Sequence, residues 1–365
     1  MVTVDELLIR TLRAGYAGCV RPVLFRLNGG DPEEIHHQMV GVLGELPASV
    51  LDVMAQFLAS SMDPVTVAGI DFPGRVGVAA GLDKDGMAAR AWAAMGYGFA
   101  ELGTVTAKAQ PGNKAPRLFR LPHSQAIINR MGFNNSGVEA MAARLDQWGV
   151  YRGNGVLGHP IGVSIGKTKT TALDAANEDY LHSLRTIAPH ADYVAINVSS
   201  PNTEGLRSLQ SRRAVESLTS ALVEETVKLD SVDPIPLFVK LAPDLVEADL
   251  TEVLAVCAAT GVSGIIATNT TITRDGLHAS ERHLASQAGG LSGAPLTAKA
   301  LAFVESIASR TELPIMGSGG IMTPRDAQRL FDAGSQLVQV YTGFIYSGPA
   351  LVMGINRLCV PGRTR

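Results

Sequence analysis

Two lysines stand at or just after apolar runs, where a charged side chain is unusual. Lys84 belongs to the segment AGLDKDG, and Lys240 ends the apolar run PLFVK. Burying an ammonium group is costly unless an anion compensates its charge. We therefore expect Lys240 to be an internal ammonium that faces a ligand. Two roles stay open for it: a Schiff-base nucleophile, or a fixed positive charge beside a group that becomes anionic during reaction.

Asparagines recur in three segments that follow apolar runs. A carboxamide offers a hydrogen-bond donor and an acceptor side by side, which matches the N–H and C=O edge of a pyrimidine or another cyclic imide. Any single asparagine is equally well explained as a turn residue or a helix cap. Their recurrence predicts a planar, polar heterocycle as ligand. The residues are Asn129, Asn134, Asn135, Asn197, Asn202 and Asn269.

Ser199 and Ser200 precede Pro201, without the GxSxG pattern of a nucleophile elbow. Ser200 is therefore either a turn residue or a base that takes a proton from carbon in a substrate activated by a neighbouring electron sink. The histidines show no HExxH or other metal-ligand spacing, so we predict no metal site.

The elements that position these residues form a regular alternation from Val76 onward. Eight β-rich runs alternate with helix-length amphipathic segments, which demands a parallel sheet and closes most naturally into a (β/α)8 TIM barrel. A doubly wound open sheet is the alternative. We expect strands at 76–80, 98–106, 161–165, 193–198, 236–241, 264–269, 313–320 and 337–343. We expect helices near 86–96, 136–148, 176–189, 210–229, 246–260, 297–309, 323–333 and 348–358.

In such a barrel the site lies at the C-terminal ends of the strands, and the loops after strands seven and eight bind phosphate. Here those loops are the glycine-rich segment 317–320 and the segment 341–343, so we expect a ligand with a phosphate group. Glycines also serve helix capping and close packing. Two polar segments, 107–128 and 274–293, interrupt the alternation of strands and helices; we call them the polar excursions. We expect the first to fold as a hairpin over the barrel mouth and the second to be disordered or a lid.

The chain divides into a helical extension, residues 1–62, and the barrel, residues 63–365. Between residues 6 and 27, leucines and valines recur at helical spacing, with four arginines against one glutamate. Such a basic amphipathic stretch either lies on an anionic membrane surface or packs on the barrel.

Composition limits the partners. The 365 residues carry a formal net charge of −3, which excludes nucleic acid as the main partner because phosphate binding needs a concentrated basic field. No apolar run reaches the roughly 20 residues that span a bilayer, so we expect peripheral attachment at most.

Eleven blocks along nearly the whole chain resemble the dihydroorotate dehydrogenases, and specifically the class 2, quinone-dependent enzymes. The blocks are AAGLDKDG, GTVT, FRLP, INRMGFNN, IGKTK, NVSSPNT, VKLAPD, TNTT, GGLSG, GSGGI and QVYTGF. The resemblance implies an FMN-binding (β/α)8 barrel that oxidises (S)-dihydroorotate to orotate in de novo pyrimidine (UMP) biosynthesis. A membrane quinone is the implied final electron acceptor.

The resemblance also implies the role of each site residue. Implied FMN contacts are Ala80, Gly81, Thr104, Ser164, Asn197, Lys240, Thr268, Gly293, Gly320, Tyr341 and Thr342. Implied orotate contacts are Lys84, Asn129, Met131, Gly132, Phe133, Asn197, Asn202, Asn269 and Thr270. Ser200 is the implied catalytic base, where class 1 relatives place cysteine. Ser164 departs from the pattern, because many class 2 members carry asparagine there.

In the implied reaction Ser200 removes a proton from C5 of dihydroorotate while a hydride leaves C6 for the flavin. Lys84 and the asparagines fix the substrate ring and its carboxylate. Lys240 stabilises negative charge on the flavin. Thr203 or a water is a hypothetical relay for the proton.

The extension is implied to form a hydrophobic tunnel from the membrane to the flavin, lined partly by His36, Arg120 and Tyr341. It would attach the enzyme peripherally to the cytoplasmic side of the cell's inner membrane. Three alternatives compete: a flavin-free aldolase or lyase that uses Lys240, a non-catalytic binder of phosphate ligands, and a class 1 enzyme that uses fumarate or NAD.

Overall fold

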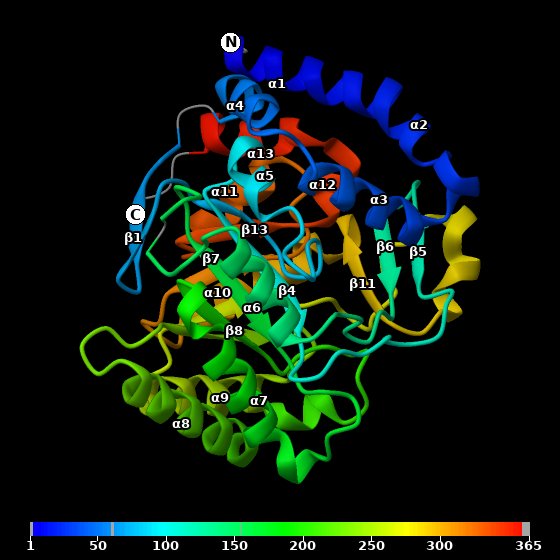
Figure 1. Cartoon of the computed structure of the whole chain (residues 1–365). Helices are drawn as coiled ribbons and strands as arrows, with labels where there is room; N and C mark the ends of the chain where they lie inside the picture. Colours follow the sequence, from blue (N-terminus) through cyan, green and yellow to red (C-terminus); the bar gives the residue numbers. More distant parts are fainter. Residues whose placement is uncertain (1–2, 60–61, 154, 360–365) are drawn as a thin grey trace.

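The computed structural model describes residues 3–59, 62–153 and 155–359, in which eight parallel strands close into a barrel (Figure 1). The strands follow one another around the barrel in chain order, and β13 closes it on β3 through the register Val340↔Val78. They are β3 (Val76–Val78), β4 (Phe99–Val105), β7 (Ile161–Ile165), β8 (Tyr193–Asn197), β9 (Leu237–Leu241), β10 (Gly264–Ala267), β12 (Ile315–Ser318) and β13 (Leu337–Val340). The predicted TIM barrel is confirmed, and the open sheet is excluded because neither edge is free.

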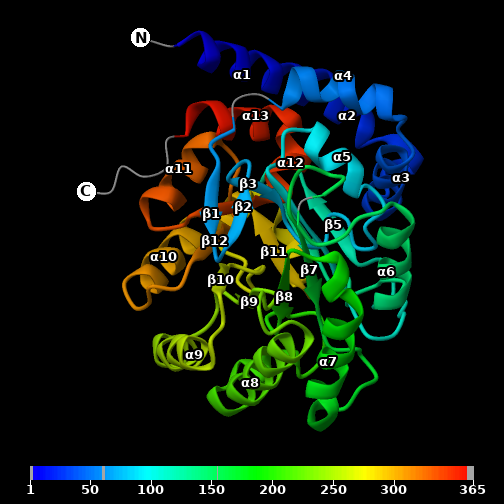
Figure 2. The same ribbon diagram turned by 60° about the vertical axis from the view of Figure 1, so that its left-hand side comes forward.

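Helices surround the barrel, and each buries one apolar stripe against the strands (Figure 2). All eight predicted helices are present, each shorter than predicted by one to five residues. They are α5 (Ala89–Ala94), α6 (Val138–Gln147), α7 (Ala176–Ile187), α8 (Arg212–Leu229), α9 (Glu247–Thr260), α10 (Thr297–Ala308), α11 (Pro324–Asp332) and α13 (Pro349–Leu358). The short helix α12 (Thr342–Ser347) lies between β13 and α13.

Aromatic side chains fill the N-terminal end of the barrel. Each ring lies over a glycine of the neighbouring strand, where a Cβ would approach it to within 2.3 Å. The pairs are Phe99 over Gly77, Tyr193 over Gly162 and Phe238 over Gly264. Phe72, from the hairpin β1 (Val65–Val67) and β2 (Ile70–Phe72), packs edge-on against Phe99. This end of the barrel is therefore plugged, and a ligand enters from the other end.

The two polar excursions form one small sheet beside the barrel mouth. Strands β5 (Leu118–Leu121) and β6 (Ala126–Asn129) make the predicted hairpin, and β11 (Gly290–Gly293) pairs antiparallel with β6. The 3-10 helix η6 (Ala279–Ser286) precedes β11. The second excursion is thus ordered structure, because its end supplies the third strand of this sheet.

The N-terminal extension is helical, as predicted for the part of it that the structure describes; residues 1–2 and 60–61 lie outside. It comprises α1 (Val4–Gly15), the π-helical turn η1 (Tyr16–Val20), α2 (Arg21–Leu24), the 3-10 turn η2 (Leu27–Gly30), α3 (Pro32–Gly44) and α4 (Ala48–Leu58). In Figure 1 these helices cross one end of the molecule, over α12 and α13.

Hydrogen bonds hold the extension on the barrel. The hydroxyl of Tyr16 donates to the carbonyl of Ile345 at 3.1 Å, and Arg21 donates to the carbonyl of Tyr346 at 3.0 Å. On α3, Glu33 accepts both a 3.0 Å and a 2.7 Å bond from the guanidinium of Arg117. Whether the extension ends at residue 62 stays a prediction.

Of the helices in the described ranges, none alone has the length and apolar composition to cross a bilayer. Helices α3 and α4 pass that test only together, as a pair bent by 103°.

Candidate active site

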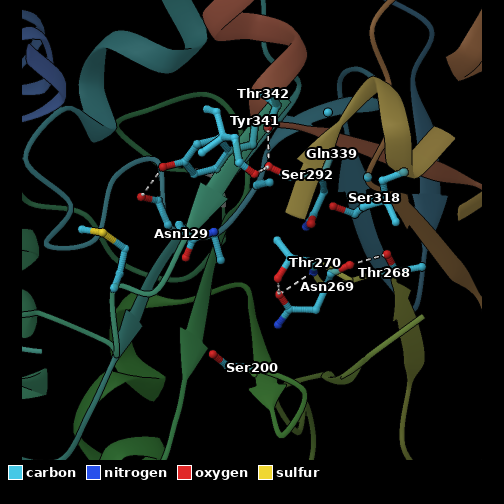
Figure 3. Close-up of a pocket in the computed structure, with 18 of the residues that line it drawn as sticks. Asn129, Ser200, Thr268, Asn269, Thr270, Ser292, Ser318, Gln339, Tyr341 and Thr342 are labelled. Atoms are coloured by element: carbon cyan, nitrogen blue, oxygen red, sulfur yellow. Dashed lines mark hydrogen bonds between the residues drawn. The ribbon is translucent and has the colours of Figure 1, made fainter. Parts of the chain in front are cut away.

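A cavity opens at the C-terminal ends of the strands, with an empty volume of about 1080 Å³ including its mouth. Every residue predicted to contact orotate lines it, and so does Ser200. Of the residues predicted to contact FMN, all line it except Ser164. Ser318 of the predicted phosphate loop also contributes, and so do Ser292 and Gln339, to which the sequence analysis gave no individual role (Figure 3).

Amides form a connected group on one wall of the cavity. The Nδ2 of Asn197 donates to the Thr104 hydroxyl at 2.9 Å, and its Oδ1 accepts from the Ser199 hydroxyl at 3.2 Å. The Nδ2 of Asn269 donates to the same Ser199 hydroxyl at 2.9 Å. These bonds fix two strand-end loops, those after β8 and β10, relative to one another.

A second amide pair joins the hairpin to the barrel. The Nδ2 of Asn202 donates to Oδ1 of Asn129 at 3.1 Å. The Oδ1 of Asn202 is buried and has no hydrogen-bond partner among the described residues. A buried acceptor without a partner is costly, so this atom is positioned for a donor on a ligand.

Two of the asparagines do not reach the cavity wall. The Oδ1 of Asn135 accepts backbone N–H groups of Thr106 and Gly137, and its Nδ2 donates to the Phe133 carbonyl. Asn135 thus braces the backbone behind the cavity. Asn134, its neighbour, is likewise absent from the lining. For Asn135 the alternative explanation given above, a structural residue of a turn, therefore holds.

Ser200 lies in the loop after β8, buried to 5% exposure, at the far side of the cavity from Tyr341 and Thr342 (Figure 3). Its hydroxyl accepts the backbone N–H of Asn202 at 3.2 Å. Arg207 donates to the Ser199 carbonyl at 3.1 Å and thereby braces the same loop. The hydroxyl of Thr203 is buried and has no partner in the described chain.

Lys240 points into the barrel from β9 and is buried at the floor of the cavity, as the sequence predicts. Its Nζ donates to Oε1 of Glu101 on β4 at 3.2 Å. Sequence reasoning missed Glu101 and also Gln339, whose Nε2 donates to Oε2 of the same carboxylate at 2.6 Å. The sequence does contain a signal for Glu101 and Gln339, because each is a polar residue within an otherwise apolar strand, as Lys240 is.

Lys84 lines the cavity in the loop after β3. Burial lowers the pKa of Lys84 to about 8, and the negative charges of Glu33 and Asp85 oppose part of that shift. An ammonium that is held partly out of water binds a carboxylate more strongly than an exposed one does.

The loops after β12 and β13 meet at one end of the cavity. They pack so closely that a Cβ on Gly343 would lie 1.9 Å from the carbonyl oxygen of Ile321. The hydroxyls of Ser292 and Thr342 are hydrogen-bonded at 2.8 Å beside them. Small residues here leave room for an anion near backbone N–H groups, as expected for a phosphate site.

Ser164 lies behind the cavity wall and is fully buried. Its hydroxyl is hydrogen-bonded to that of Thr104 at 2.8 Å. A contact between Ser164 and a ligand in the cavity would therefore pass through Thr104, which does line the cavity.

The predicted tunnel residues lie where the extension meets the barrel. Arg120 on β5 donates to the carbonyl of Phe25 at 3.1 Å, and its guanidinium lies 4.2 Å from the centre of the Phe25 ring. Burial lowers the pKa of His36 on α3 to about 3, with a smaller contribution from Lys84. Burial raises the pKa of Tyr341 to about 12. Of these three side chains only Tyr341 lines the cavity itself.

Within the described residues, no group of three or more His, Cys, Asp or Glu side chains could hold a metal ion. Polar groups in the cavity are amides, hydroxyls and two ammonium groups. This donor set suits an organic ligand with carbonyl, imide and anionic groups.

Fold and cavity together define a (β/α)8-barrel enzyme with its site on the C-terminal face. The sequence profile described as dihydroorotate dehydrogenase matches residues 62–358. The chain belongs to the dihydroorotate dehydrogenase family, whose members are flavin-dependent oxidoreductases.

Relatives cover nearly the whole chain. A protein of Chloroflexus aurantiacus named dihydroorotate dehydrogenase (quinone) is 50% identical over 347 residues, which span 93% of this chain and 94% of that one. One of the same name from Salinispora arenicola is 51% identical over 342 residues, 91% and 95% of the two chains. The structure of DHODH from Eimeria tenella in complex with ferulenol has a TM-score of 0.79 at 36% identity and covers 92% of this chain and 93% of its own. The predicted quinone-dependent dihydroorotate dehydrogenase is thereby confirmed.

Proposed function

We propose that this cavity binds FMN together with dihydroorotate, and that the extension brings a membrane quinone to the same cofactor. The enzyme oxidises dihydroorotate to orotate, a step of pyrimidine biosynthesis. The observation that carries the proposal is that one cavity is lined by a cluster of amides, by a buried ammonium and by the closely packed, glycine-rich loops after β12 and β13.

The residues of the cavity fit FMN. The loop segments 318–321 and 341–343 would hold its phosphate, while Lys240 and Asn197 would contact the ring system at the barrel floor. The Oε1 of Gln339 is buried there without a partner in the described chain, as expected where a ligand donor completes the site. When bound, FMN supplies an acceptor for the substrate's hydride and a relay for electrons to the quinone.

The opposite wall would bind the substrate. Lys84 would pair with the carboxylate of dihydroorotate. The Oδ1 of Asn202, which has no partner in the described part of the chain, would accept an N–H of the ring. Fixing the ring through several hydrogen bonds supplies the orientation that proton and hydride removal require. Ser200 would take the proton from C5. The hydroxyl of Thr203, which has no partner within the described ranges, would relay it.

Lys240 would act as a fixed charge and not as a Schiff-base nucleophile. Its Nζ donates a hydrogen bond to Oε1 of Glu101 at 3.2 Å, so the amine is held in an ion pair inside the barrel. A Schiff-base lysine must instead be free and neutral before it attacks a carbonyl.

The extension would serve the quinone and the membrane. On α1 and α2, apolar side chains are exposed: Leu7 is 62% exposed and Val23 is 61% exposed. Helix α4 adds Phe57, which is 70% exposed. Both views place α1, α2 and α4 at the same end of the molecule (Figures 1 and 2). The apolar side chains of this surface would insert into the cytoplasmic leaflet of the inner membrane. The quinone would then reach the flavin site past His36, Arg120 and Tyr341.

A single preparation tests the proposal. The purified protein should be yellow, and heat should release FMN identified by its chromatographic retention and mass. Anaerobic dihydroorotate should bleach that colour, and a quinone should restore it where fumarate and NAD do not. A colourless protein, or one whose flavin stays oxidised with dihydroorotate, would refute it.

A further inference from the structure

Glu101 is a fully buried carboxylate inside the barrel, one layer beneath the cavity. It does not line the cavity, yet it accepts hydrogen bonds from three neighbours. Lys240 donates to Oε1 at 3.2 Å, and Gln339 and the hydroxyl of Tyr193 donate to Oε2 at 2.6 and 3.3 Å. A carboxylate this deep in a barrel is costly to bury unless such partners compensate it.

Two of the three partners reach the cavity. Lys240 and Gln339 come from strands on different sides of the barrel, β9 and β13, and both line the cavity floor. One carboxylate, that of Glu101, therefore holds both the ammonium group of Lys240 and the amide of Gln339 in place through hydrogen bonds. The amide presents Oε1, which has no partner in the described chain, and its Nε2 is held by the carboxylate.

We propose that Glu101 is a positioning residue that fixes Lys240 and Gln339 under the flavin and offsets the ammonium's charge, so that it sets the redox potential of the bound cofactor. This inference rests on the proposed binding of FMN in the cavity. Reduction of a flavin adds negative charge to its ring, which a neighbouring ammonium favours. A carboxylate paired with that ammonium weakens the effect, because the pair carries no net charge.

The charge balance gives the direction of the expected change. In Glu101→Gln the side chain keeps its shape and can still accept from Gln339, but the counter-charge of Lys240 is removed. The floor of the cavity then carries a net positive charge, and reduced flavin is favoured. We expect the ratio of reduced to oxidised flavin at a fixed ambient potential to rise about tenfold, or ~30 mV for a two-electron couple.

Spectroelectrochemical titration of the FMN-loaded enzyme measures this potential directly. The matched control is Glu225→Gln. Glu225 lies on the outer helix α8, and its carboxylate is paired with Arg185 on α7. The control should keep the wild-type potential, whereas Glu101→Gln should be more positive. A Glu101→Gln potential equal to that of wild type, or more negative, overturns the proposal.

If Glu101→Gln does not fold or does not retain FMN, the redox potential of Tyr193→Phe is measured in its place. Tyr193 does not line the cavity, and its loss removes one hydrogen bond from the carboxylate while all charges stay. The less compensated carboxylate should shift the potential slightly to the negative, opposite to Glu101→Gln. An unchanged or more positive potential overturns the proposal. Wild-type protein without FMN would instead refute the proposed function, so the two failures are distinguishable.

Discussion

Asn202 and Asn129 lie 73 residues apart in the sequence, and a 3.1 Å hydrogen bond joins their side chains at the cavity wall. The bond uses Nδ2 of Asn202 and leaves its buried Oδ1 without a partner among the residues that the structure describes. It also connects the loop after β8, which carries Ser200, with the hairpin strand β6. One contact therefore links the proposed base, the hairpin and the substrate pocket.

Removing this amide should weaken substrate binding. Loss of a buried hydrogen-bond partner costs about 1–3 kcal/mol, so Asn202→Ala should raise the KM for dihydroorotate by a factor of roughly 5 to 150. FMN content should not change. Asn177→Ala, which removes an exposed amide that bonds to Ser217 on α8, should keep the wild-type KM. An unchanged KM in Asn202→Ala would show that this amide does not contact substrate.

Substrate affinity should fall at alkaline pH. Lys84 is charged below its pKa of about 8 and neutral above it, and only the charged form attracts the carboxylate of dihydroorotate. KM should therefore be constant below pH ~7 and rise about tenfold per pH unit well above pH ~8. Lys84→Met should have a high KM without this rise, while Lys114→Met, at an exposed lysine, should follow wild type. A Lys84→Met profile that still rises would assign the titration to another group.

Gly343→Ala should release the cofactor. The new Cβ would lie 1.9 Å from the Ile321 carbonyl oxygen, so the loops after β12 and β13 must separate at the proposed phosphate site. FMN content after gel filtration should drop severalfold. Gly41→Ala on α3, where a Cβ meets no atom within 4 Å, should keep full content. Full occupancy in Gly343→Ala would place the phosphate elsewhere.

Much of this arrangement follows from the sequence, because strand ends in a (β/α)8 barrel converge whatever the loops between them do. Asn197 is the last residue of β8, Lys240 is the last but one of β9, and Asn269 follows the end of β10 by two residues. All three line the cavity as expected. The hairpin at 107–128 was predictable for a similar reason, since its polar segment breaks the strand–helix alternation.

Other features depend on contacts that have no local signal. The third strand of the small sheet, β11, pairs with β6 across more than 150 positions of sequence, so the segment 274–293 looked like a loop. Asn135 is the same residue type as Asn129 in the same segment of sequence, but its side chain forms hydrogen bonds with the backbone of Thr106 and Phe133. Glu101 does have a local signal, a charged residue inside an apolar strand, but its pairing with Lys240 has none, because only the closed barrel brings the two together.

Charges on the exposed apolar side chains of the extension should detach the enzyme from membranes. Leu7→Glu combined with Val23→Glu should reduce binding to anionic lipid vesicles by at least roughly tenfold, since each buried side chain contributes about 1.5–3 kcal/mol. Turnover with a long-chain quinone in vesicles should fall, and turnover with a short-chain soluble quinone should not. The control is Val232→Glu, at a residue that is 93% exposed in the loop between α8 and β9. Equal vesicle binding by all three proteins would exclude this surface as the membrane contact.

The most direct test of the central claim is the rate at which dihydroorotate bleaches the flavin of Ser200→Ala in anaerobic stopped flow. The claim is that Ser200 takes the C5 proton from a substrate held against FMN in this cavity. Loss of a general base should slow bleaching about 10²- to 10⁴-fold with FMN fully bound, while Ser208→Ala, at an exposed serine of the same segment, should react like wild type. Bleaching of Ser200→Ala at the wild-type rate would contradict the account.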